Sequence, residues 1–322
     1  MSRDPWSLRV VTPTYFDVES LLVLRARIRS VVEAATQAGD LSQLESLRFT
    51  VIDDSAGHDP EIARLGDLDD VTVVSPPFNL GHQRAIVYGL RSIADSLKPN
   101  EIVVMMDSDG EDQPEDLPRL VGPLLADPDD IWTVSIARRT EREEGLAFKV
   151  LYLGFRLLFR TLTGREIRSG NYSALHSGYV ARMIDHPYFD LCYSASLISL
   201  NPAPTFVPCA RGVRYAGESR MGLEGLLNHG VRMLMPFADR IAIRSLAFFT
   251  ALACSTALLA VVIVTGHLVS GWTVPGWAGW ALLGGALGSC LALVNFLVLF
   301  SGFAQSSALA LSRLDPSRDQ RR

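Results

Sequence analysis

Short apolar runs alternate with amphipathic stretches over about the first two hundred residues of the chain. Runs with the length of buried strands lie at about residues 8–11, 48–52, 71–74 and 102–106. Stretches with helical periodicity lie between the first and second runs, at about 20–38, and between the third and fourth, at about 81–96. This alternation predicts an α/β fold in which a doubly wound sheet carries helices on both faces.

A different pattern fills the C-terminal part of the chain, where no Asp, Glu, Lys or Arg occurs from Ser245 to Ser312. Two apolar segments within it, at about 245–265 and 277–303, are each long enough to cross a bilayer as a helix. The alternative is a buried hairpin in a soluble protein, but soluble helices rarely lack charge on every face. The pattern predicts a first domain over 1–238 and a membrane domain over 239–322.

Basic residues predict the orientation of these spans in the membrane. They flank the spans on both outer sides and are absent from the connecting loop. Basic residues favour the cytoplasmic side, so we expect both termini and the first domain to be cytoplasmic, in an integral protein of the cell membrane. The polar start of the chain predicts no cleaved leader. The residues are Arg232, Arg240 and Arg244 before the first span, and Arg313, Arg318, Arg321 and Arg322 after the second.

Charge and cysteine content exclude some classes of function. The formal net charge of −5 argues against a nucleic acid as the partner. Its four cysteines form no closely spaced pair, and two of them lie inside the apolar segments. They are therefore interpreted as small hydrophobic residues and not as disulfides or zinc ligands.

Candidate chemistry gathers where the predicted strands end. The apolar run at 102–106 stops at Asp107 and Asp109, which project the same way from an extended backbone and can reach one metal ion. Carboxylates of this kind suit Mg²⁺ or Mn²⁺ held together with substrate phosphates and water. An acidic turn in solvent is the simpler alternative for this pair alone. Polar turns also follow the other three runs, at 12–15, 53–55 and 79–82, and ligands collect at this edge of a sheet.

The four motifs together resemble the family 2 glycosyltransferases of the GT-A fold. In order they are Val-Val-Thr-Pro-Thr-Tyr (10–15), Val-Ile-Asp-Asp-Ser (51–55), Asn-Leu-Gly-His-Gln (79–83) and Met-Asp-Ser-Asp-Gly-Glu-Asp-Gln-Pro-Glu (106–115). Within the family the chain is most similar to polyprenyl-phosphate and dolichyl-phosphate sugar synthases, including bactoprenol glucosyltransferases. The resemblance implies a mixed sheet with helices on both faces, followed by a two-helix transmembrane hairpin.

The resemblance also implies the roles of individual residues. Asp109 would bind a cation that bridges two phosphates, and Asp107 would lie near the ribose or the metal. Either Asp54 or its neighbour Asp53 would lie near the base, although Asp53 could equally form a turn. Glu111 replaces a residue of the family pattern and either supports the residues that bind the metal or is a surface charge. The other residues implied at the nucleotide-sugar site are Pro13, Tyr15, Asp17, Asn79, Gly81 and Gln83.

Arginines recur in two later clusters and could bind phosphate, since guanidinium groups suit bidentate phosphate contacts. One cluster would hold the donor diphosphate and the other the lipid phosphate, although each arginine alone could be a surface charge. The predicted phosphate and acceptor residues are Arg138, Arg142, Arg211, Arg214, Ser219 and Arg220.

A predicted helix at 148–162 has one apolar face and precedes a segment predicted to be a loop. The helix could lie in the membrane interface or pack against a sheet or a second protomer. In the predicted loop the family usually has Gly-Asp-Phe-Arg, whereas this chain has Gly-Asn-Tyr-Ser at 170–173. Asn171, the candidate catalytic position, cannot accept a proton. An alcohol acceptor would therefore lack a general base here, but an ionised lipid phosphate needs none.

The sequence thus predicts an inverting, metal-dependent transfer of a sugar from a UDP- or GDP-linked donor to a polyprenyl phosphate. Alternatives are a non-catalytic membrane scaffold that binds nucleotide sugars, and a transferase that acts on another lipid or glycan. A processive polysaccharide synthase is disfavoured because no tryptophan follows an arginine, so the Gln-x-x-Arg-Trp signature is absent. Self-association through Gly284, Gly285 and Gly288 would give a homo-oligomer.

Overall fold

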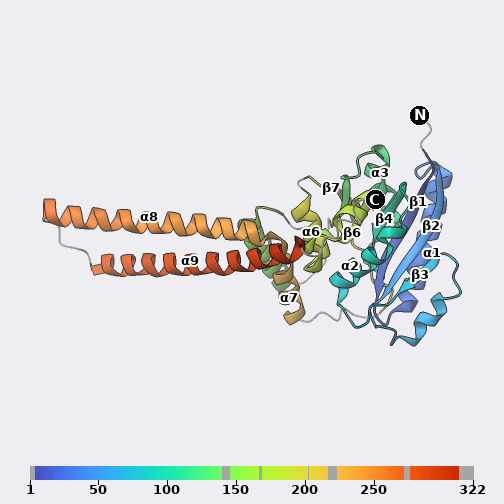
Figure 1. Ribbon diagram of the computed structural model, residues 1–322, viewed down its shortest axis with the longest axis horizontal. Coiled ribbons are helices and arrows are strands. Elements are labelled where there is room, and N and C mark those ends of the chain that lie inside the picture. The colour runs from blue at the N-terminus through green and yellow to red at the C-terminus, as the bar shows by residue number, and fades with distance from the viewer. Residues whose placement is uncertain are drawn as a thin grey trace. The chain divides into compact units, whose positions relative to one another are not determined.

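The computed structural model describes residues 4–139, 146–166, 169–201, 203–216, 223–271 and 276–311. The chain forms two compact units (Figure 1). The first comprises Met1–Arg156 and Arg165–Pro236, and the second comprises Leu157–Gly164 and Phe237–Arg322. The last seven residues of one helix, α4 (Leu146–Thr163), therefore belong with the C-terminal part of the chain.

A seven-stranded mixed sheet in the order β3-β2-β1-β4-β6-β5-β7 forms the centre of the first unit. Strands β1, β2, β3 and β4 are parallel, whereas β6 pairs antiparallel with both β4 and β5, and β7 is parallel to β5. The predicted α/β class and mixed sheet are confirmed. The strands are β1 (Trp6–Thr14), β2 (Leu44–Asp53), β3 (Val71–Val74), β4 (Glu101–Met105), β5 (Val134–Arg139), β6 (Ser169–His176) and β7 (Thr205–Cys209).

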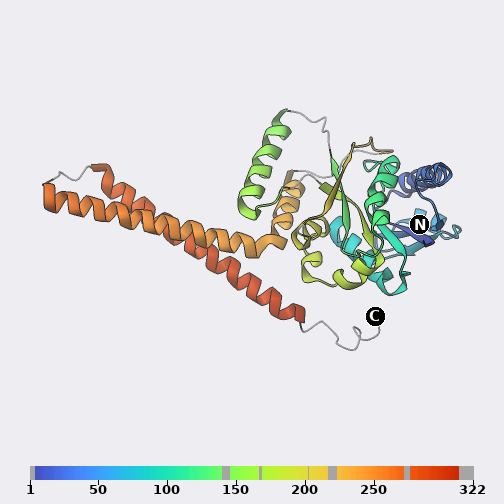
Figure 2. The same cartoon turned by 90° about the horizontal axis from the view of Figure 1, so that it is seen from above.

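Helices cover both faces of this sheet (Figure 2). The longer ones in the first unit are α1 (Val18–Ala38), α2 (His82–Ile93), α3 (Leu117–Ala126), α5 (Ser177–Met183), α6 (Tyr193–Leu200) and α7 (Leu223–Leu234). Short 3₁₀ helices are η1 (Pro60–Leu65), η2 (Ala94–Ser96), η3 (Pro114–Asp116), η4 (Pro187–Asp190) and η5 (Met235–Phe237).

Alternation along the strands assigns each helix to a face. Leu8 and Val10 of β1 belong to one buried cluster with Leu24 of α1 and Leu120 of α3. The opposite face carries α2, which approaches so closely that a Cβ at Gly89 would lie 2.4 Å from Ile52 Cγ1. Because the strands of the parallel part all end at one edge, their polar turns converge there.

Strand β6 corrects the prediction of a loop at residues 170–173. Its residues from Asn171 to Leu175 are buried, and the polar ones among them are paired inside the protein. Ser173 Oγ donates to the Asn171 carbonyl oxygen at 2.8 Å and lies 2.8 Å from the Tyr193 hydroxyl. A strand that is buried on both faces and carries satisfied polar groups lacks the alternation by which strands are recognised.

The second unit contains two long helices, α8 (Ala238–Ser270) and α9 (Gly276–Leu311), which pack together as a hairpin. Asn295 Nδ2 donates to Ser245 Oγ at 3.0 Å, and a Cβ at Gly285 would lie 2.2 Å from Thr256 Oγ1. Stretches Asn228–Ser270 and Gly276–Gly302 are long and apolar enough to cross a membrane. The two predicted apolar segments are thus helical and lie in α8 and α9.

Close packing in the hairpin involves two of the three glycines that are predicted to serve self-association. Gly285 faces Thr256, and a Cβ at Gly288 would lie 3.0 Å from Leu252 Cδ2. A Cβ at Gly284 would meet no atom within 4 Å. Gly285 and Gly288 therefore serve the contact between α8 and α9.

Candidate active site

A cavity of about 300 Å³ lies at the carboxyl ends of the parallel strands. It gathers residues from all four polar turns that the sequence marks, together with one arginine from much later in the chain. The cavity is lined by Pro13, Thr14, Tyr15, Asp17, Asp54, Asn79, Gly81, His82, Asp107, Ser108, Asp109 and Arg214.

The two predicted metal ligands, Asp107 and Asp109, follow β4 and both line this cavity. Their side chains are 17% and 16% exposed, so each carboxylate is largely removed from water yet open to a ligand. The Asp107 backbone N–H donates to Asp112 Oδ2 at 3.0 Å, and the Glu111 N–H donates to Asp109 Oδ1 at 3.0 Å. These bonds fix the acidic turn.

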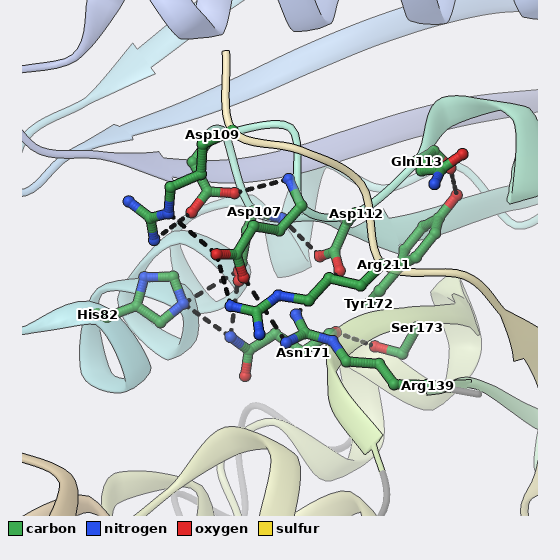
Figure 3. Close-up of polar contacts among 12 residues, drawn as sticks. His82, Asp107, Asp109, Asp112, Gln113, Arg139, Asn171, Tyr172, Ser173 and Arg211 are labelled. Atoms are coloured by element: carbon green, nitrogen blue, oxygen red, sulfur yellow. Dashed lines mark hydrogen bonds and ion pairs between the residues drawn. The ribbon is translucent and has the colours of Figure 1, made fainter. Parts of the chain in front are cut away.

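Asp107, His82 and Asn171 point toward one another (Figure 3). Asp107 Oδ1 lies 3.1 Å from His82 Nε2 and accepts a hydrogen bond of 3.1 Å from Asn171 Nδ2. Asn171 Nδ2 also lies 2.7 Å from His82 Nε2. Burial lowers the pKa of His82, but the negative charge of Asp107 outweighs burial and raises this pKa. The amide nitrogen of Asn171 acts in the opposite direction, because as a hydrogen-bond donor it favours a His82 Nε2 that carries no proton. Asn171 therefore acts here as a donor, not as a base.

Three arginines surround Glu111 beside the carboxylate pair. Glu111 Oε1 accepts from Arg211 at 2.7 Å and from Arg214 Nε at 2.9 Å, and Arg139 lies 3.7 Å from Oε2. Burial would raise the pKa of Glu111, but hydrogen bonds from Arg211 and Arg214 outweigh it and lower that pKa. Arg214 also lies 2.7 Å from Asp109 Oδ2. Glu111 is thus an anchor for arginines and not a surface charge.

The segment that supplies two of these arginines crosses directly over the acidic turn. Tyr215 N–H donates to the Asp109 carbonyl at 2.9 Å, and Gly212 N–H donates to the Glu111 carbonyl at 2.8 Å. Gly110 adopts φ +89°, and a Cβ there would lie 2.8 Å from the Tyr215 ring. A Cβ at Gly212 would lie 2.2 Å from the Gly110 oxygen. This close contact requires glycine at both positions.

Electrostatics at the paired carboxylates fit a divalent cation. Burial and the neighbouring Asp107 raise the pKa of Asp109. Burial would also raise the pKa of Asp107, but His82 outweighs it and the pKa falls. A cation between the two carboxylates would relieve their repulsion and replace lost hydration. Among the described residues no cluster of three or more His, Cys, Asp or Glu side chains is placed to hold a metal, so substrate oxygens and water would complete the coordination.

The adjacent acidic residues Asp53 and Asp54 have different environments. Asp53 accepts within its own turn, from Ser55 N at 3.1 Å, Ser55 Oγ at 2.5 Å and Gly57 N at 2.9 Å. Asp54 lines the cavity and accepts from Leu80 N at 2.8 Å, while Asn79 Nδ2 donates to the Asp54 carbonyl at 3.1 Å. Asp53 therefore holds the turn, and Asp54 faces the ligand space.

The other predicted site residues divide into three groups. Pro13, Tyr15, Asp17 and Gly81 line the cavity, and Gly81 has φ +77° where helix α2 begins. Gln83 and Arg138 are absent from the lining: Gln83 is buried beside Asn171, and Arg138 lies 3.8 Å from Glu166. Three predicted phosphate or acceptor residues, Arg142, Ser219 and Arg220, lie outside the described residues.

Sequence reasoning did not assign roles to two histidines near the carboxylates. His82 belongs to the Asn-Leu-Gly-His-Gln motif, and its position after Gly81 at the sheet edge is the signal that could predict a role for it. His229 lies on α7, where burial and the nearby His82 lower its pKa and Asp107 acts in the opposite direction. No local pattern around residue 229 marks it, because its position relative to His82 and Asp107 depends on the tertiary fold.

The chain belongs to glycosyl transferase family 2, whose family model matches residues 9–185. It is similar to the undecaprenyl-phosphate 4-deoxy-4-formamido-L-arabinose transferase of Yersinia enterocolitica, with 24% identity over 280 residues, 84% of this chain and 78% of that protein. The enzyme of the same name from Sodalis glossinidius is 24% identical over 260 residues, 74% of this chain and 73% of that protein. The resemblance to polyprenyl-phosphate sugar transferases is therefore confirmed, and the chain is a transferase.

Solved structures with a similar arrangement include glucosyl-3-phosphoglycerate synthase from Mycobacterium tuberculosis in complex with Mn²⁺, UDP and glucosyl-3-phosphoglycerate. This structure has a TM-score of 0.45 and 19% sequence identity, and the match covers 73% of this chain and 80% of that chain. A mycobacterial protein gives a TM-score of 0.47 at 19% identity, over 73% of this chain and 75% of that chain.

Proposed function

We propose that this chain transfers a sugar, with inversion, from a nucleotide-diphospho-sugar to a polyprenyl phosphate at the cytoplasmic face of the membrane. The observation that carries the proposal is that Asp107 and Asp109 line one cavity together with Arg214, which pairs with Asp109. Relatives named for transfer to undecaprenyl phosphate support this acceptor class. The two long apolar helices would retain the enzyme where such a lipid resides.

The donor diphosphate would lie beside the acidic turn. Asp107 and Asp109 would hold Mg²⁺ or Mn²⁺, which supplies charge neutralisation for the departing diphosphate when bound. Arg214 would turn from Asp109 to a phosphate oxygen, and Arg211 would remain anchored on Glu111 nearby. This is electrostatic stabilisation of a leaving group and requires no proton transfer.

The nucleoside would occupy the end of the cavity lined by Tyr15 and Asp54. Asp54 is held by Leu80 N–H, so its carboxylate has a fixed direction and can accept from a base or a ribose hydroxyl. Uracil and guanine both carry N–H donors that such a carboxylate could bind. We therefore keep UDP- and GDP-linked sugars as the donor class.

The environment of Asn171 favours an acceptor that is already ionised. Asn171 occupies the position at which a carboxylate would serve an alcohol acceptor, and its amide nitrogen faces Asp107. A phosphate monoester carries a negative charge near neutral pH and attacks without losing a proton. Orientation of the lipid phosphate toward the sugar then supplies the rest of the rate enhancement.

The test is an assay of the full-length protein in membranes, with radiolabelled UDP- and GDP-sugars and added undecaprenyl phosphate. We expect a chloroform-soluble, acid-labile labelled product that depends on Mg²⁺ or Mn²⁺. Asp109→Asn should abolish it, whereas Asp67→Asn, at an exposed aspartate that does not line the cavity, should not. Nucleotide binding without any lipid product would support the scaffold alternative instead.

A further inference from the structure

Gln83 connects the active site to the start of a helix behind it. Its side chain is buried, with 7% exposure, and does not line the cavity. Gln83 Oε1 accepts from the Ser194 backbone N–H at 3.3 Å, in the first turn of α6, and from Cys192 Sγ at 3.2 Å. A backbone N–H can only donate, so the oxygen of Gln83 must face α6 and its nitrogen must face the other way.

That nitrogen fixes the orientation of Asn171. Gln83 Nε2 donates to Asn171 Oδ1 at 2.6 Å, so the amide oxygen of Asn171 is already directed at Gln83. The amide nitrogen of Asn171 then faces Asp107 Oδ1 at 3.1 Å as a donor. If the amide of Asn171 turned over, its nitrogen would face the nitrogen of Gln83, so that two donors would meet. Its oxygen would then face the carboxylate of Asp107, so that two acceptors would meet.

We propose that Gln83 and Asn171 form a relay of hydrogen bonds that holds the Asp107 carboxylate in position for the metal–diphosphate group. This inference rests on the proposed function. Neither Gln83 nor Asn171 is a metal ligand in this scheme; both are positioning residues. Asn171 donates to one oxygen of Asp107 and leaves the other available, while Gln83 prevents the amide from turning over.

The relay gives residue 171 a role as an amide, where the family pattern given by the resemblance has a carboxylate. A carboxylate at residue 171 would still accept from Gln83 Nε2. It would, however, direct a second negative oxygen at Asp107, which is 17% exposed and poorly screened by water. The amide instead gives Asp107 a donor, and hydrogen bonds to charged acceptors are among the stronger ones.

Direct binding of Mn²⁺ tests the relay without relying on turnover. The full-length protein in detergent is titrated with Mn²⁺ in the presence of UDP, and in a parallel series GDP, and free Mn²⁺ is measured by electron paramagnetic resonance. Both Asn171→Leu and Gln83→Met keep the side-chain volume. We expect Asn171→Leu to weaken Mn²⁺ binding about tenfold, the effect of one hydrogen bond to a charged group. Gln83→Met removes only the neutral hydrogen bond that orients Asn171 and should weaken Mn²⁺ binding about threefold. The double variant should be no weaker than Asn171→Leu, because both changes break one chain of contacts.

Asn201→Leu is the matched control, since Asn201 is also a buried amide but bonds the Tyr179 hydroxyl and the Leu197 carbonyl oxygen and no residue of the relay. It should leave Mn²⁺ affinity unchanged. Unaltered affinity in folded Gln83→Met or Asn171→Leu, or fully additive losses, would overturn the relay. If Gln83→Met does not fold, Asn171→Leu decides alone. Wild-type protein that binds no Mn²⁺ with either nucleotide would count against the proposed function itself.

Discussion

The guanidinium group of Arg214 lies 2.7 Å from the carboxylate of Asp109, and both residues line the cavity. Arg214 comes from the segment that crosses the acidic turn and is held there by Glu111. An arginine that pairs with a predicted metal ligand can exchange this partner for a phosphate when a diphosphate and its cation arrive. Binding of the nucleotide-sugar and the position of the segment that carries Arg214 therefore depend on each other.

Replacing Arg214 should affect the binding of the nucleotide-sugar more than the rate of sugar transfer within the bound complex. We expect Arg214→Ala to raise the KM for the nucleotide-sugar by about tenfold to a hundredfold, since a hydrogen bond to a charged group contributes about 1.5–3 kcal/mol. Arg214→Lys should recover part of this loss, because it keeps the charge but not the fork of donors. Arg119→Ala, at an exposed arginine paired with Asp116, is the control and should leave KM unchanged.

Although Asp53 and Asp54 are adjacent, replacing Asp53 should reduce the stability of the protein, whereas replacing Asp54 should reduce its affinity for the nucleotide. Asp53→Ala removes the carboxylate that accepts hydrogen bonds from the N–H groups of Ser55 and Gly57. This change should lower the free energy of unfolding by about 2–3 kcal/mol. Asp54→Ala should mainly reduce nucleotide affinity. Thermal unfolding and UDP or GDP binding measured on both variants check this. The opposite assignment, with Asp53 needed for binding by a fully stable protein, would contradict the environments described above.

Asp70 should make the first unit sensitive to acid. Burial raises the pKa of Asp70, but hydrogen bonds from Arg25 at 2.5 Å and Arg29 at 2.7 Å outweigh it and lower the pKa below 3.8. The stabilisation is therefore fully present above about pH 4 and is lost as the pH falls through the folded-state pKa. Asp70→Asn should cost about 1–2 kcal/mol at pH 7 and progressively less below pH 4. Thermal unfolding of both proteins at pH 7, 4 and 3 measures this; a constant difference across the series would contradict it.

Two neighbouring glycines of α9 provide a matched pair for the hairpin. Gly285→Leu places a side chain against Thr256 and should destabilise the packing of α8 on α9 by about 1–3 kcal/mol. Gly284→Leu should be tolerated, since a Cβ at Gly284 meets nothing within 4 Å. Thermal unfolding in detergent compares the two. Loss of a cross-linked dimer in Gly284→Leu alone would indicate that this glycine serves the predicted self-association.

Regular patterns made most of the fold predictable. The apolar run before Asp107 and the uncharged stretch after Ser245 are long local signals, so β4 and the hairpin helices could be read from neighbouring residues. Strand β6 could not be predicted from neighbouring residues, because its buried polar side chains form hydrogen bonds with residues far away in the chain. Ser173 bonds Tyr193, and Asn171 bonds Gln83, 88 positions earlier.

Prediction of the site succeeded for residues that follow strands and was weaker for residues that depend on partners. Asp107, Asp109 and Asp54 lie at the cavity as their positions after strands indicated. Glu111 left two interpretations open, since only the fold brings Arg211 and Arg214 to it. Arg138 has the residue type of a phosphate ligand, but the end of β5 places it near Glu166 instead.

Strand β6 lies between β4 and β5 although both precede it in the chain. A growing polypeptide therefore carries two strands with unsatisfied edges until residues 169–176 have left the ribosome, and such edges invite pairing between chains. Pairing across this sequence distance is also slow. Asp107 and Asn171, 64 positions apart, meet only when this insertion is complete. Nascent chains arrested before β6 should accordingly be aggregation-prone clients of chaperones, with the acidic pocket still unformed.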